Sequence, residues 1–194
     1  VVFRREYTDL RDSTCKDFEK YTGLKITSER SVKLQNKSEI LFRHLEEIHG
    51  VVQNMNLGWF WIEQAEELDT DEQFDVLRGR LRRDAKRRTG FITANTNGHN
   101  WIYNTWKVGT DKDYELHEAT SFDAEKYLPA DTIEDWKKLE QTNPKIYRRF
   151  VLNSWDESDT SDIIIAPEWV RRCSRNSMNI RHPISRFIFC DVAR

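Results

Sequence analysis

The stretch Trp59-Phe60-Trp61-Ile62-Glu63-Gln64-Ala65-Glu66-Glu67-Leu68 places four bulky apolar residues directly before a run of acidic and polar ones. An apolar run of this length, ended by polar residues, predicts a short strand that is buried on both faces. Such strands are typical of parallel α/β sheets. Ligands bind these sheets beyond the carboxyl ends of the strands, so Glu63 is expected where chemistry usually takes place.

An acid at the end of a buried strand also has the form of a Walker B element, in which a carboxylate holds Mg²⁺ beside a nucleotide phosphate. Many strands end in an acid, however. A carboxylate that caps the next helix or lies in solvent is the alternative interpretation of Glu63. The surrounding sequence therefore has to decide between them.

Composition excludes several classes of protein. The chain has 194 residues, of which 33% are charged and 12% aromatic, as in ordinary globular domains. Its net charge of −2 means that any contact with DNA must come from a local basic patch. Cys15, Cys173 and Cys190 show no metal-ligand spacing, which disfavours a disulfide scaffold or a zinc site and fits a reducing cytoplasm. No apolar run has the length of a membrane helix, and we expect no signal peptide.

Strands and helices alternate along the predicted chain, which argues for a mainly parallel α/β core. The predicted strands cover residues 1–4, 31–35, 39–42, 58–63, 90–95, 114–120 and a last one from 184. The predicted helices cover residues 8–21, a segment from Thr70, and residues 100–107, 130–141 and 144–152. Gly23 is the expected end of the first helix, and Thr70 and Gln73 form a predicted capping box at the start of the second. The last helix is expected to have Asn143 as its N-cap and Pro144 in its first turn. Residues 154–183 are the predicted linker.

Taken in order, these pieces resemble the large subunit of a tailed-phage terminase, the ATP-driven motor that packages DNA. Residues 4–13 (RREYTDLRDS) are similar to the segment that follows the phosphate-binding loop. Residues 33–43 (KLQNKSEILFR) are similar to the hairpin before Walker B, and residues 61–67 (WIEQAEE) to Walker B itself. Residues 92–101 (ITANTNGHNW) resemble the coupling motif of the family and the segment after it.

The later part of the chain carries the same resemblance. Residues 123–149 resemble the helical end of the ATPase domain, and residues 188–194 (IFCDVAR) the first strand of the nuclease domain. The resemblance implies a P-loop NTPase fold of the RecA/ASCE-like type, incomplete, over residues 1–153. It also implies the start of an RNase H-like nuclease domain over residues 184–194.

Two functional parts of such a motor are missing from the sequence. No GxxxxGK[ST] motif occurs, so the phosphate-binding loop is expected upstream of Val1. Nuclease cleavage with a metal pair needs several acids, and the expected nuclease strand supplies only Asp191. We therefore expect residues 1–194 alone neither to hydrolyse ATP nor to cut DNA.

The resemblance implies roles for individual residues. Glu63 corresponds to the acid that positions Mg²⁺, and Asp191 to a first nuclease metal ligand. Gln64 lies where the family usually has the glutamate that polarises water, but an amide cannot accept a proton. Two alternatives follow: Glu66 or Glu67 supplies the base, or Gln64 only positions the water.

Further roles follow from the coupling motif and from the basic residues. Thr93, Ala94 and Asn95 would sense the γ-phosphate, with strand-end packing as the alternative. One interpretation of Arg4 and Arg5 is that either contacts nucleotide as an arginine finger, and structural ion pairs are the alternative. Arg82, Arg83, Arg87 and Arg88 could contact DNA phosphates, although a solvated helix face is the commoner explanation of such a run.

The resemblance predicts a parent protein that hydrolyses ATP with Mg²⁺, packages double-stranded DNA into procapsids and cleaves concatemers. Its expected partners are DNA, a small terminase subunit, the portal protein and sibling subunits of a homo-oligomeric ring. Its expected location is the host cytoplasm, transiently at the procapsid portal. The alternatives are a helicase-like DNA translocase and a non-catalytic nucleic-acid-binding module on a degenerate ATPase fold.

Overall fold

The computed structural model describes residues 1–46, 52–156 and 169. Two compact units divide the chain, Val1–Thr160 and Ser161–Arg194. All described residues except Trp169 belong to the first unit, and everything below concerns that unit. The expected nuclease strand, including Asp191, and most of the expected linker lie outside the described residues.

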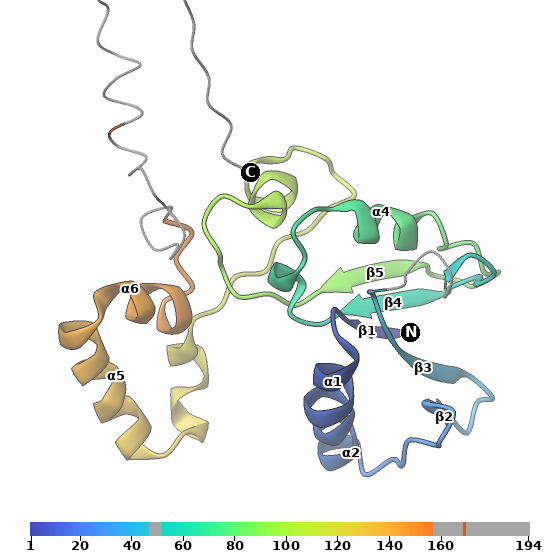
Figure 1. Ribbon diagram of the computed structural model, residues 1–194, viewed down its shortest axis with the longest axis horizontal. Helices are drawn as coiled ribbons and strands as arrows, with labels where there is room; N and C mark the ends of the chain where they lie inside the picture. The colour runs from blue at the N-terminus through green and yellow to red at the C-terminus, as the bar shows by residue number, and fades with distance from the viewer. Residues whose placement is uncertain (47–51, 157–168, 170–194) are drawn as a thin grey trace, which may run out of the picture. The chain divides into compact units, whose positions relative to one another are not determined.

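A mainly parallel five-stranded sheet forms the centre of this unit, as the sequence predicted (Figure 1). Its order is β2-β3-β1-β4-β5, and the only antiparallel pair among these strands is β2–β3, the predicted hairpin. The strands are β1 (Val2–Arg4), β2 (Ser31–Lys33), β3 (Glu39–His44), β4 (Trp59–Ile62) and β5 (Thr89–Ile92). Because β1, β4 and β5 are parallel, their carboxyl ends meet at one edge of the sheet.

The two faces of β4 are buried to different extents. Phe60 and Ile62 are almost fully buried in the larger core cluster, whereas Trp59 and Trp61 are only half-buried on the opposite face. There the ring of Phe91, itself 46% exposed, stacks against Trp59 and Trp61 with centroid separations of 6.0 and 5.9 Å. The prediction of a strand buried on both faces is therefore right for the first face and only partly right for the second.

Gly90 allows β4 and β5 to pack closely. A Cβ atom at this position would lie 2.2 Å from Cζ of Phe60. The Phe60 ring therefore occupies the space that any other residue at position 90 would need. The contact packs the two strands together on the face that α4 covers, where the Phe60 ring also meets Phe74.

Helices cover both faces of the sheet. On one side α4 (Glu72–Arg78) lies over β4 and β5, and its Phe74 and Leu77 enter the larger core cluster (Figure 1). On the other side a continuous helical stretch follows β1. It consists of α1 (Tyr7–Asp9), the π-helical η1 (Leu10–Thr14) and α2 (Cys15–Thr22), and it ends at Gly23 in the left-handed region, as predicted.

The C-terminal helices also follow the prediction. The helix α5 spans Ala130–Thr142, and α6 (Pro144–Ile146) continues as η5 (Tyr147–Val151). Asn143 is the N-cap, since its side chain accepts a hydrogen bond from the backbone of Ile146. The aromatic helix predicted over 100–107 is confirmed as a turn at Trp101 and Ile102 that continues into η3 (Tyr103–Val108).

Two local predictions are wrong. The N-cap of α4 is Asp71 rather than Thr70, and no side-chain hydrogen bond caps this helix. Residues 114–120 form no strand, because Tyr114 turns into the aromatic core against Phe74 and Trp106 and no neighbouring strand pairs with this segment. A short helix, η4 (Ser121–Tyr127), with a capping box at Thr120 and Asp123 follows instead. Within the described residues, no helix is long and apolar enough to cross a lipid bilayer.

Candidate functional site at the carboxyl ends of β4 and β5

Glu63 is held at the carboxyl end of β4 by one hydrogen bond from its backbone and one to its side chain. Its backbone N–H donates to the carbonyl oxygen of Phe3 at 2.9 Å, which extends the β1–β4 pairing by one residue. Its Oε2 atom accepts a hydrogen bond from Oγ1 of Thr14, a buried residue at the end of η1. The Glu63 side chain is 22% exposed, so its carboxylate is oriented and still reachable from solvent.

Gln64 turns the chain sharply after β4. Its φ and ψ are 49° and 54°, in the left-handed region that non-glycine residues seldom adopt. The short helix η2 (Ala65–Glu67) begins at the next residue. The Oε1 atom of Gln64 accepts a hydrogen bond from Nη2 of Arg4. Strained backbone of this kind is concentrated at functional sites in proteins.

Arg4 is buried at the carboxyl end of β1 and connects the acidic residues that follow β4. Its residue surface is only 6% exposed. The guanidinium donates to both oxygens of Glu67, from Nη2 at 2.9 Å and from Nε at 3.4 Å, and Nη1 lies 3.8 Å from Oε2 of Glu63. Burial acts against the charge, but the hydrogen bond and the charge of Glu67 outweigh it and raise the pKa of Arg4. Arg4 is thus a buried ion-pair residue, the alternative that the sequence left open.

Arg5 is more exposed and contacts a different set of atoms. Its Nη1 donates to the backbone oxygen of Glu67, and Nη2 lies 3.7 Å from Oδ2 of Asp69. The side chain is 42% exposed. Of the two arginines at the end of β1, Arg5 is the one whose side chain is accessible enough to contact another molecule.

Glu66 connects the end of β4 with the end of β5. Its Oε1 accepts a hydrogen bond from Nδ2 of Asn95 at 3.0 Å, whereas its Oε2 is buried and has no hydrogen-bond partner among the described residues. Burial raises the pKa of Glu66, and its bonds with Asn95 only partly oppose that change. A carboxylate with a raised pKa and a spare oxygen is a better proton acceptor than one that is fully paired.

The residues that follow β5, Thr93, Ala94 and Asn95, are uncharged. Backbone bonds of 3.0 Å join Thr93 to Ile62 and to Ala65, and its Oγ1 accepts from the indole N–H of Trp61, also at 3.0 Å. Asn95 bonds to Glu66 as described. Ala94 is half-buried against the larger core cluster.

Thr96, which the sequence analysis did not single out, connects β5 to the C-terminal helices. It is 1% exposed. Its N–H donates to Oδ1 of Asn153 at 3.1 Å, and its carbonyl oxygen accepts from Nε of Arg149 at 3.1 Å. Asn153 itself adopts a left-handed φ of 53°, and no pattern in the sequence indicates that conformation.

Comparisons with known proteins assign this fold. The family model for the phage terminase large subunit matches residues 1–153. This chain belongs to the phage terminase large subunit family. No curated protein matches it.

Solved structures of large terminases share the fold at low sequence identity. The large terminase of the thermophilic bacteriophage D6E is 16% identical, with a TM-score of 0.64 over 80% of this chain and 40% of its own. The same protein in complex with ATP-gamma-S is 17% identical, with a TM-score of 0.60 over 80% of this chain and 39% of its own. The large terminase ATPase domain of Thermus phage P74-26 is 13% identical, with a TM-score of 0.50 over 79% of this chain and 75% of its own.

The basic run of this terminase chain does not lie on a helix. The helix α4 ends at Arg78, so Arg82, Arg83, Arg87 and Arg88 belong to the exposed loop that leads to β5. The solvated helix face that was the alternative for this run is therefore wrong. The loop is attached to the sheet through backbone bonds between Leu57 and Arg80 and between Leu57 and Arg83, at 2.8 and 3.2 Å.

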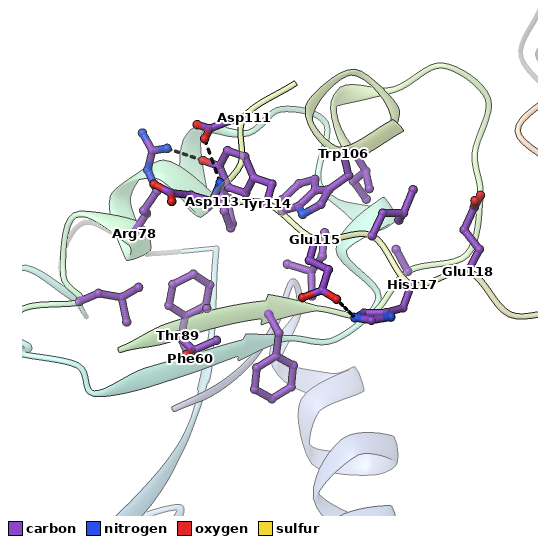
Figure 2. A pocket seen from close by; sticks show the side chains of 18 of the residues that line it. Phe60, Arg78, Thr89, Trp106, Asp111, Asp113, Tyr114, Glu115, His117 and Glu118 are labelled. Carbon is purple, nitrogen blue, oxygen red and sulfur yellow. Dashed lines mark hydrogen bonds and ion pairs between the residues drawn. The ribbon is translucent and has the colours of Figure 1, made fainter. Parts of the chain in front are cut away.

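A cavity of about 730 Å³ borders β5 on the side away from β4. Figure 2 shows its lining, in which Tyr114 and Trp106 lie over the end of α4 and His117 pairs with Glu115 at 3.1 Å. Of the predicted site residues that the structure describes, Ala94 and Arg88 line it and the others do not. The cavity is thus separate from the acidic residues that follow β4.

The donor groups of the terminase site suit a magnesium ion that receives most of its ligands from elsewhere. Among the described residues there is no cluster of three or more His, Cys, Asp or Glu side chains that could hold a metal. Mg²⁺ is commonly bound by one or two carboxylates together with phosphate oxygens and waters. Glu63, with one oxygen bonded to Thr14 and a partly exposed carboxylate, fits the role of a single protein ligand.

Proposed function

We propose that this chain is part of a motor that uses ATP and Mg²⁺ to package viral double-stranded DNA into procapsids. The chain spans about 40% of the length of the bacteriophage D6E terminase, so the activity of the whole protein is part of the proposal. Its partners would be DNA, a small terminase subunit, the portal protein and sibling subunits, in the host cytoplasm. Concatemer cleavage at a metal pair, with Asp191 as one ligand, belongs to the same proposal.

The observation that carries the proposal is the position of Glu63 in a chain of this family. Its oriented carboxylate lies at the carboxyl end of β4, next to the coupling-motif residues Thr93 and Asn95 at the end of β5. Glu63 would hold Mg²⁺ there. The bound ion would supply positive charge against the negative charge that develops during phosphoryl transfer.

We further propose that Glu66 is the proton acceptor and that Gln64 orients the attacking water. Glu67 is a poorer candidate because both of its oxygens accept from Arg4. Glu66 keeps one buried oxygen without a partner, and its pKa is raised by burial. Gln64 uses its Oε1 atom to accept from Arg4, which leaves its NH₂ group to donate to a water.

The phosphate-binding loop that this function requires is not encoded in residues 1–194. In the described part of the chain, β5 pairs with β4 alone, and the cavity borders its other edge. We propose that the strand carrying the loop pairs with this edge. Its loop would then lie at the same end of the sheet as Glu63.

The first test replaces Glu63 in the full-length terminase. Glu63→Gln keeps the size of the side chain and removes the charge that binds the metal. We expect ATP turnover to fall at least about 100-fold, as is typical when a group that stabilises the transition state electrostatically is lost. Glu134→Gln is the matched control, since Glu134 is exposed on α5. Undiminished turnover in Glu63→Gln would remove this residue from the metal site.

The second test separates the roles of positions 64 and 66. Glu66→Gln should lower turnover about 100-fold or more, because no proton acceptor remains. Gln64→Glu in that background should restore much of the activity, since it returns a carboxylate to the position where the family usually has one. Undiminished turnover in Glu66→Gln would show that Glu66 is not the base.

A further inference from the structure

Thr14 is a buried hydroxyl residue that contacts the proposed metal ligand. It lies at the end of η1 and is 3% exposed. Its Oγ1 must be the donor in the bond to Oε2 of Glu63, because an ionised carboxylate only accepts. The π-helical turn over Leu10–Thr14 adds one residue to the helix, which rotates the side chains after it by roughly 100° relative to an uninterrupted α-helix.

This hydrogen bond gives the two oxygens of the Glu63 carboxylate different surroundings. Oε2 is occupied by Thr14 and lies 3.8 Å from the Arg4 guanidinium. Oε1 has no such partner among the described residues and is the oxygen left to a cation. Thr14 thereby selects both the rotamer of Glu63 and the atom through which it can bind.

Arg4 orients the side chain of Gln64 as Thr14 orients that of Glu63. Its Nη2 donates to Oε1 of Gln64, and its pairing with Glu67 holds the guanidinium in place. A guanidinium donates in a fixed planar fork, so its direction is set once Glu67 is bound. The Gln64 amide is therefore oriented with its NH₂ group away from Arg4.

We propose that Thr14 and Arg4 are positioning residues, Thr14 for the carboxylate of Glu63 and Arg4 for the amide of Gln64. This inference rests on the proposed function, because it assigns to these residues the orientation of a magnesium ligand and of a water-binding group. Neither residue contacts nucleotide itself. The sequence analysis considered Arg4 as an arginine finger and did not consider Thr14.

The test of Thr14 uses two matched variants in the full-length terminase. Thr14→Val has nearly the same shape without the hydroxyl, and Thr14→Ser keeps the hydroxyl. Calorimetry should show that Thr14→Val binds Mg²⁺·ADP about tenfold more weakly, the effect expected of one hydrogen bond to a charged group, whereas Thr14→Ser binds like the wild type. Binding of ADP in excess EDTA should be equal in all three proteins.

Thr14→Ala gives the same comparison if the valine variant does not fold. Equal Mg²⁺·ADP affinity of the hydroxyl-free and hydroxyl-bearing variants would overturn the role of Thr14. If Glu63→Gln also bound Mg²⁺·ADP like the wild type, the proposed function itself would fail. A loss with Glu63→Gln but not with Thr14→Val would reject only the present inference.

The test of Arg4 is a double-mutant cycle with Gln64. Arg4→Lys keeps the charge and loses the planar fork, so we expect kcat to fall about tenfold with an unchanged KM for ATP. In a Gln64→Ala background the same change should have little further effect, because the group that Arg4 positions is gone. An equal loss in both backgrounds would mean that Arg4 acts on the fold and not through Gln64.

Discussion

The ends of β4 and β5 are neighbours in the sheet and are built from opposite kinds of interaction. After β4, the acidic Glu63 and Glu67 gather around the buried charge of Arg4. After β5, the uncharged residues Thr93 and Thr96 are held by hydrogen bonds, and those of Thr96 reach the guanidinium of Arg149 and the side chain of Asn153 near the C-terminal helices. The only side-chain hydrogen bond described between the two polar segments beyond the strands joins Glu66 to Asn95.

The difference indicates a division of labour between the two strand ends. Charged groups in a partly dehydrated site interact strongly with a metal and with phosphates, so the end of β4 is suited to binding and chemistry. The hydrogen bonds of Thr96 instead join the end of β5 to the helical segment. On the proposed function, the end of β5 would pass a change at the nucleotide to that segment, with Glu66–Asn95 as the link.

The largest effect on stability is expected at Arg4. Arg4→Met leaves the carboxylates of Glu63 and Glu67 without their buried partner, which should cost about 3 kcal/mol in free energy of unfolding. Arg11→Met is the control, because the exposed Arg11–Asp12 pair contributes little. Urea denaturation of the full-length protein measures both. Similar losses in the two variants would mean that the end of β4 is not held by buried charge.

A smaller loss is expected where the end of β5 meets the helices. Asn153→Ala removes the acceptor for the buried N–H of Thr96 and keeps a left-handed backbone without the side chain that stabilises it. We expect a cost of about 2 kcal/mol. Asn143→Ala, which removes an exposed N-cap, should cost about 1 kcal/mol. An Asn153 effect below that of Asn143 would contradict a structural link through Thr96.

The hydrogen bond between the Trp61 indole and Thr93 should contribute less to the free energy of unfolding. Thr93→Val removes the acceptor for the Trp61 indole, and Trp61→Phe removes the donor. Each change should cost about 1 kcal/mol for the hydrogen bond, in addition to the packing that Trp61→Phe loses. The double variant should lose less than the sum of the two single effects. Strict additivity in denaturation experiments would show that the two side chains do not interact.

The smallest effect concerns pH and Glu66. Because burial raises its pKa above the ordinary value of 4.5, the folded state binds this proton more tightly than the unfolded chain does. The contribution of Glu66 to stability is thus greatest below about pH 4.5 and declines as the pH rises through the folded pKa. Glu66→Gln lacks this decline, so its stability relative to the wild type should increase with pH by less than about 1 kcal/mol. Thermal unfolding between pH 4.5 and pH 8 measures this difference, and a trend of the opposite sign would contradict the raised pKa of Glu66.

Local sequence patterns predicted most of the sheet and several helix ends. The apolar run before Glu63, the glycine after residue 22 and the Asn143-Pro144 pair each specify a conformation through nearby residues alone. The prediction of a strand over 114–120 was wrong because a strand depends on residues that are distant in the sequence. Strand formation there needed a partner edge, and the aromatic ring of Tyr114 instead found Phe74 and Trp106, which lie far from it in sequence or in a different element.

The sequence by itself determined the family, the parallel α/β core and the strand end at which Glu63 lies, because these depend on periodicity and motif order. Only the tertiary structure decided that Arg4 turns inward to Glu67, that Thr14 binds Glu63, and that Thr96 joins Arg149 and Asn153. These contacts join residues 49 to 63 positions apart. Their existence depends on how the sheet brings separate strand ends together, which no local pattern encodes.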